Sequence, residues 1–189
     1  MPHFAWDTAS SIILQHGLDE LCSCVLDAPK FSLTVADPEK EDCPIVACGD
    51  GFAELTGYSV HEIVGRNCRF LMDNVPWHLI DTSVHMKCRE FIERSSARGR
   101  TALQQPEAIG ELCVQVNAKK SGQLFQNAFI LGDLDVARHR LIFALHCALP
   151  EDCLCNNRQI SCLQQAFETI REHCSTLEDM LVAPLPPWA

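Results

Sequence analysis

Residues 111 to 149 constrain the fold most, because they predict three consecutive strands joined by short turns. The strands are expected at residues 111–117, 124–131 and 140–149. Lys119-Lys120-Ser121-Gly122 has the composition of a hairpin turn between the first two strands, and residues 133–139 are expected to form the next turn. Strands that follow one another through short turns pair antiparallel. This half of the chain therefore predicts an antiparallel sheet.

The remaining residues add two strands and several helices to that sheet. The two strands are expected at 31–35 and 44–48, and helical segments at 51–56, 59–63, 67–72 and 79–94. A polar loop is expected at 95–110 and a linker at 150–155, with flanking helices at 5–26 and 157–181. The last helix spaces its apolar residues alternately by three and four, as in a heptad seam. The order predicts an α+β fold: a five-stranded antiparallel sheet with helices on one face, and flanking helices at both ends. The expected divisions are residues 1–29, 30–150 and 151–189.

Composition excludes several classes of function. A net charge of -10 disfavours nucleic acid and anionic membrane surfaces as partners. No apolar run reaches membrane-spanning length and no secretory signal is evident, so we expect a cytoplasmic protein, with the nucleus as the alternative. The chain has twelve cysteines but no evident export signal, which disfavours disulfides, and the cysteines lack the spacing of zinc ligands. Most of them are therefore expected to be buried apolar residues, and no metal site is expected. No nucleophile–base pair stands out, and we do not expect an enzyme.

One cysteine has a setting of its own. Gly65-Arg66-Asn67-Cys68-Arg69-Phe70-Leu71 resembles the signature of LOV (light-oxygen-voltage) domains, the flavin-binding, blue-light-sensing branch of the PAS fold. The likeness continues upstream in GFAELTGY at 51–58 and EIVG at 62–65. Downstream it includes Asn117, the Lys-Ser-Gly turn and Asn127, which is followed by an Ala-Phe pair. It covers residues 31 to 149.

The resemblance implies a mechanism centred on Cys68. Blue light excites a bound flavin, the thiol adds to its C4a atom, and the adduct breaks again in the dark. A hydrophobic slot is expected to keep the thiol neutral beforehand, because burial disfavours a thiolate. Asn67 and Leu71 are the other motif residues expected to line the site.

Two asparagines are expected to recognise the polar edge of the flavin. Asn117 and Asn127 each offer a donor and an acceptor, and adjacent strands of a hairpin can place both on one face. Phe129 and Leu131 share the face of Asn127 and are expected to pack on the ring, with Thr34 a further lining candidate.

Two arginines are expected to hold the phosphate. Arg69 follows the thiol and can form charge-assisted hydrogen bonds, and Arg89 resembles a second phosphate-binding arginine of the family. FMN is the expected cofactor. The segment DNVPWHLIDT at 73–82 is longer than in the shortest family members, so FAD stays open.

Three positions depart from the family pattern. Met72 and His146 stand where glutamine is usual, and Cys43 where asparagine is often found. The glutamine on the last strand senses the protonation of flavin N5. A histidine can donate or accept according to its tautomer, so we hypothesise that His146 takes over this relay or acts as a base that hastens adduct decay.

The resemblance also implies how a signal leaves the domain. The chain is similar to short LOV proteins without an effector, so the flanking helices or a homodimer contact are the expected output. The 157–181 helix is equally compatible with docking on the sheet, pairing with the 5–26 helix, or a coiled coil with a downstream partner. Two rival readings remain at this point: a flavin-based redox sensor of the same fold, and a PAS-type interaction module without flavin.

Overall fold

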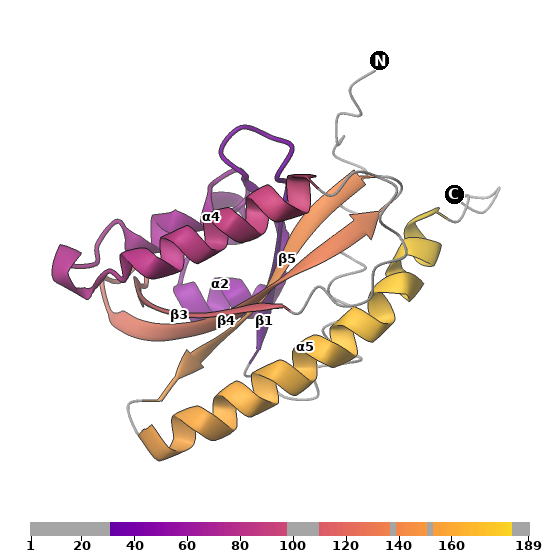
Figure 1. Ribbon diagram of the computed structural model, residues 1–189. Helices are drawn as coiled ribbons and strands as arrows, with labels where there is room; N and C mark the ends of the chain where they lie inside the picture. The colour runs from indigo at the N-terminus through magenta and orange to yellow at the C-terminus, as the bar shows by residue number, and fades with distance from the viewer. Residues whose placement is uncertain (1–30, 98–109, 137–138, 151–152, 183–189) are drawn as a thin grey trace.

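The computed structural model describes residues 31–97, 110–136, 139–150 and 153–182, with the side chains of the last helix described as far as Arg171. The helix expected at 5–26 and most of the loop expected at 95–110 lie outside these residues. In the described part, helices cover both faces of one sheet (Figure 1).

The sheet has five antiparallel strands in the order β2-β1-β5-β4-β3. Their bounds are β1 Ser32–Ala36, β2 Ile45–Cys48, β3 Glu111–Ala118, β4 Leu124–Val136 and β5 His139–Leu149. All five expected strands are confirmed. The turn expected at 133–139 is wrong, because β4 continues to Val136 and pairs there with His139 of β5. Cross-strand hydrogen bonds extend the ladder into this polar segment, whose composition had suggested a turn.

The helices between β2 and β3 form a layer over one face of the sheet, which we call the inner face (Figure 1). They are α2 Asp50–Thr56, α3 Val60–Ile63, the 3₁₀ segments η1 Cys68–Met72 and η2 Trp77–Leu79, and α4 Thr82–Ala97. The long helix expected from residue 79 starts at Thr82, after the separate η2 turn. α3 begins with a capping box in which Ser59 and Glu62 bond each other's backbone.

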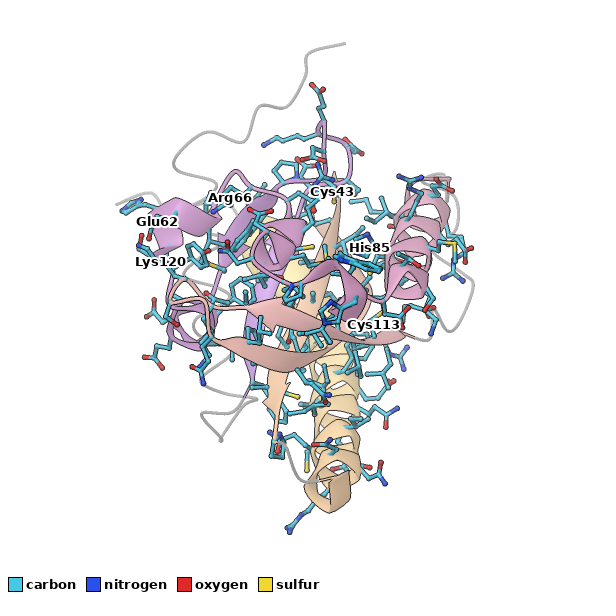
Figure 2. All side chains as sticks on the ribbon, turned by 90° about the vertical axis from the view of Figure 1, so that its left-hand side faces the viewer. Cys43, Glu62, Arg66, His85, Cys113 and Lys120 are labelled. Atoms are coloured by element: carbon cyan, nitrogen blue, oxygen red, sulfur yellow. The ribbon has the colours of Figure 1, made fainter. Side chains whose placement is uncertain are left out.

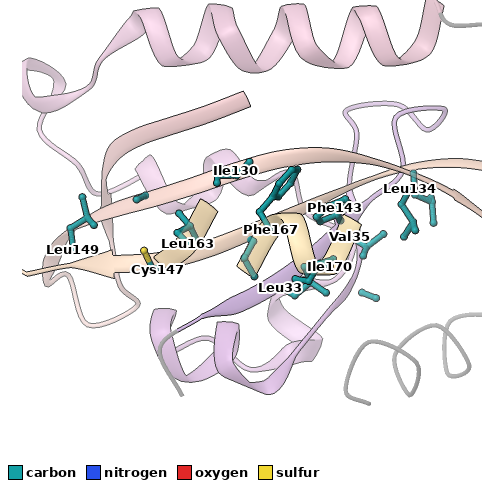
Figure 3. Packing of buried hydrophobic residues seen from close by; sticks show 14 residues of the cluster. Leu33, Val35, Ile130, Leu134, Phe143, Cys147, Leu149, Leu163, Phe167 and Ile170 are labelled. Atoms are coloured by element: carbon teal, nitrogen blue, oxygen red, sulfur yellow. The ribbon is translucent and has the colours of Figure 1, made fainter. Parts of the chain in front are cut away.

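The opposite, outer face is covered by α5 Cys153–Val182. Leu163, Phe167 and Ile170 of α5 are buried against strand residues such as Phe143, whose ring stacks on Phe167 at 5.2 Å between centroids (Figure 3). Of the alternatives for this helix, docking on the sheet is the one observed for its described side chains. The linker expected at 150–155 is shorter than predicted, since the helix already starts at Cys153.

Strand alternation separates the two layers. Outward residues of β5, including Leu145 and Cys147, belong to the core under α5, whereas Ile142 and Ala144 pack with Phe91 of α4 on the inner face. A second inner cluster joins Phe52 of α2, Ile63 of α3 and the η1 residues Phe70 and Leu71. Among the described residues, no helix has the length and apolarity needed to cross a membrane.

Candidate functional site

Cys68 is the first residue of η1, and Asn67 caps that segment. Asn67 Oδ1 accepts a hydrogen bond from the backbone N–H of Arg69 at 3.0 Å. Its Nδ2 donates to the backbone oxygen of Asp42 at 2.6 Å. Asparagine is a favoured cap because its oxygen satisfies an otherwise unpaired N–H. Asn67 therefore fixes where Cys68 lies, and η1 as a whole packs on β3.

Cys68 is exposed to solvent as a residue, although the surrounding protein desolvates its thiol. Its surface is exposed to solvent, yet the surrounding protein raises its pKa through desolvation, while the neighbouring Arg69 guanidinium lowers it. The neighbouring Cys43 is similar: burial and then Cys68 raise its pKa to about 12. Both thiols are therefore protonated at neutral pH.

The two arginines that flank Cys68 have protein partners. Arg69 forms an ion pair with Asp42, and Arg66 pairs with Asp73 at 3.4 Å. The guanidinium of Arg66, which is labelled in Figure 2, also lies 4.2 Å from the centroid of the Phe70 ring. Arg69 and Arg89 are both exposed, and Arg89 lies on α4. Their phosphate-binding role stays a prediction.

The predicted strand residues converge on the inner face of the sheet. In the ladder, Asn127 lies opposite Ala148, Phe129 opposite His146, and Leu131 opposite Ala144. Gln115, opposite Asn127 on β3, is also buried. The sequence analysis did not single out Gln115, although its even spacing from Asn117 places both on one face.

Four of these side chains form a buried polar chain across four strands. Asn127 Nδ2 donates to Asn117 Oδ1 at 2.9 Å and lies 3.2 Å from His146 Nδ1. The other ring nitrogen of the histidine, Nε2, lies 3.0 Å from Thr34 Oγ1. Asn117, Asn127, His146 and Thr34 are each 5% exposed or less. The expectation that both asparagines point inward is confirmed, and His146 lies on the same face as they do.

His146 lies among aromatic rings, and in the part of the chain that the structure describes burial is the cause that shifts its pKa. Its ring centroid lies 4.8 Å from that of Phe52 and 5.6 Å from that of Phe129. Burial is the cause that lowers the pKa of His146 from its ordinary value of 6.5 to about 3. The imidazole is therefore neutral at physiological pH. The Phe52 contact was not predicted, because α2 meets β5 only in the tertiary structure.

Met72, the last residue of η1, contacts α4. Its Sδ lies 3.0 Å from Nε2 of His85, and the methionine is partly buried (Figure 2 labels His85). Leu71, the residue before it, is buried in the inner cluster with Phe70. Methionine in place of an amide leaves this part of the site with apolar packing and one sulfur contact.

One observation tests whether these residues suit a flat ligand with a polar edge. Asn127 Oδ1 is completely buried and has no hydrogen-bond partner among the residues that the structure describes, although leaving such an atom unpaired is costly. On the same face of β4, Phe129 lies against the His146 ring and Leu131 packs with Phe91 of α4. An unpaired acceptor amid apolar and aromatic groups fits a planar heteroaromatic ligand that offers an N–H group there.

Comparisons with known proteins agree with this arrangement. No family model matches the chain. White collar 1 protein of Neurospora crassa is 39% identical over 98 residues, which is 51% of this chain and 8% of that protein. Other curated relatives are named blue-light-activated histidine kinases and phototropins. In each of these five relatives the match spans less than a fifth of the relative's own length.

Solved structures share the fold. One, from work on a flavin analogue and light-oxygen-voltage domain mechanism, is 26% identical with a TM-score of 0.54, covering 82% of this chain and 95% of that one. The light-state dimer of the fungal blue-light photoreceptor Vivid is 27% identical with a TM-score of 0.51, covering 64% of this chain and 78% of the other. The antiparallel sheet and these likenesses show the fold of the light-oxygen-voltage (LOV) domains, to which this chain is similar.

Proposed function

We propose that this chain is a blue-light sensor that binds a flavin on the inner face of its sheet. The observation that carries the proposal is the unpaired, buried Asn127 Oδ1 beside Asn117 and His146, on a sheet face against which the Cys68 segment packs. Phe129 and Leu131 would pack against the ring, and Thr34 lies behind His146. The names of the relatives support light as the stimulus.

The bound flavin would supply blue-light absorption and the ring carbon to which the Cys68 sulfur adds reversibly. The protein contributes a protonated thiol, fixed by the Asn67 cap, in surroundings that disfavour the thiolate. A neutral thiol suits a step triggered by light, because no permanently activated nucleophile is then needed. FMN is the first choice of cofactor. Binding of its phosphate by Arg69 would require the arginine to exchange or share its Asp42 partner.

A signal would leave through the sheet. His146 points inward, while Leu145 and Cys147 on either side of it point outward into the core under α5. A shift of β5 at His146 therefore changes the surface on which Leu163, Phe167 and Ile170 pack. We propose that α5 is the output element and that light changes its packing or a homodimer contact. The light-state dimer of Vivid supports the second form of output.

The test is an absorption spectrum of the purified chain, before and after blue light. We expect structured bands near ~450 nm that bleach on illumination and recover in the dark, as the chemistry of a cysteine–flavin adduct requires. Cys68→Ala should retain flavin and lose the bleaching. Cys162→Ala removes an exposed cysteine on α5 and serves as the matched control, which should bleach normally.

Three other results would each contradict part of the proposed function. A spectrum that responds to reductants but not to light would favour a redox sensor. A chain that takes up no added flavin would favour an interaction module. Persistence of an adduct spectrum in Cys68→Ala would refute the assignment of the thiol. Size-exclusion chromatography in the dark and under light tests the homodimer.

A further inference from the structure

Cys113 lies on the inner face of β3, beneath α4. Alternation along the strand places Cys113, Gln115 and Asn117 on this face, where all three are buried, whereas Val114 between them is exposed on the other. Cys113 lies directly opposite Phe129 of β4. Because α4 packs on β3 over this face, Cys113 faces the helix (Figure 1; Cys113 is labelled in Figure 2).

Cys88 lies on the side of α4 that faces the sheet. Its spacing from Val84 and Phe91 places the three side chains on one side of the helix, and the other two are buried. Cys88 packs against the same inner-face cluster as Phe129, the residue opposite Cys113. The two cysteines therefore approach each other, one from the helix and one from the strand below it.

The thiols of Cys88 and Cys113 form a hydrogen bond with each other. A thiol can donate or accept, and either direction of this bond brings the same two sulfur atoms into contact. Both residues are free cysteines. A disulfide requires two cysteine side chains that point toward each other over a short distance, and this pair meets that condition.

The two thiols differ in their access to solvent. Cys88 is partly exposed, whereas Cys113 is 2% exposed. A dissolved oxidant therefore reaches Cys88 first. Cys113 lies beside it at an effective concentration far above that of a thiol in solution. A mixed disulfide formed at Cys88 should accordingly be resolved by Cys113 of the same chain.

We propose that Cys88 and Cys113 are a site of reversible oxidation by low-molecular-weight disulfides, and that the bond formed ties α4 to β3. The Cys88 sulfur attacks the small disulfide and releases one thiol, and the Cys113 sulfur then displaces the second. Each cysteine proton passes to one released thiol, so two cysteines are oxidised and one small disulfide is reduced to two thiols. This site does not depend on the proposed light-driven function, and it leaves the Cys68 thiol unused.

The test is incubation of the full chain, as purified, with oxidised glutathione, followed by blocking of free thiols and tryptic digestion without reduction. The contact with Cys113 and burial raise the pKa of Cys88, so exchange is slow and the incubation extends over hours. Trypsin releases these cysteines in peptides 88–89 and 101–119, which we expect to be joined by a bond that dithiothreitol reverses. Linkage of peptide 88–89 to the Cys68 peptide, residues 67–69, or a lasting glutathione on Cys88, would overturn the proposal.

Two single substitutions separate the roles of the cysteines. Cys113→Ala should retain one glutathione on Cys88, because the resolving thiol is gone. Cys88→Ala should leave Cys113 unmodified, because Cys113 is buried. Cys162, which is exposed on α5, is the internal control and should carry glutathione in the wild type and in both variants. Glutathione on Cys113 in Cys88→Ala, or none on Cys88 in Cys113→Ala, would refute the proposed exchange.

The tie between α4 and β3 is measured by thermal unfolding of the oxidised and the reduced chain. The bond should raise the Tm by about 5 to 10 °C, because it constrains the unfolded chain between the two cysteines. Cys88→Ala treated in the same way should lack this shift, which separates the bond from glutathione at other positions. A joined pair of peptides with an unchanged or lower Tm would refute the stabilising tie.

Discussion

Acidification should destabilise the folded chain through His146. Burial holds the pKa of this histidine at about 3, compared with 6.5 in exposed surroundings. The unfolded chain therefore binds a proton between these two values while the folded chain does not, so stability falls as the pH decreases through this window. Stability is highest above 6.5 and is lost progressively toward 3. Between about pH 7.5 and about pH 4.5 the contribution of this one group is about 3 kcal/mol.

Urea unfolding at these two pH values measures the effect. The wild type should lose about 3 kcal/mol more on acidification than His146→Gln, which has no titrating ring at this position. His61→Gln is the matched control, because it makes the same substitution at an exposed position on α3. His146→Gln is expected to be less stable at both pH values, so the comparison uses only the difference between them. If the wild type and His146→Gln lose the same stability on acidification, then the buried, neutral state of His146 is wrong.

Two further predictions concern the framework. Phe167→Ala should lower the free energy of unfolding by about 3 to 5 kcal/mol, because it leaves a cavity in the α5–sheet core where Phe167 stacks on Phe143. Gln164→Ala, on the exposed side of α5, is the control and should change the free energy of unfolding little. Equal losses in the two variants would show that α5 does not dock in solution. Gly57→Ala should cost about 1 kcal/mol, because Gly57 ends α2 with a φ of 76°, and Gly57→Asn should cost less since asparagine tolerates this conformation. Thermal unfolding ranks these variants, and a Gly57→Ala chain as stable as the wild type would contradict the strain argument.

Local patterns predicted most of the fold because each depends on neighbouring residues. The capping box at Ser59, the hairpin turn at 119–122 and the alternation along 124–131 all describe interactions that the chain makes within a few residues. The end of β4 was missed because its last residues are held by β5, and that pairing outweighs their polar composition.

The candidate site also combines features that the sequence predicts with features that depend on tertiary contacts. From the sequence alone one can predict the residues expected to line a flavin site: the cysteine motif, the two asparagines at even spacing and the histidine on the last strand. The contacts between these side chains are seen only in the folded structure. It paired Arg69 with Asp42, placed Phe52 against His146, and linked Thr34 of β1 to Asn127 of β4 through the imidazole. These contacts join segments far apart in the chain, and the direction of each hydrogen bond depends on partners that no local pattern specifies.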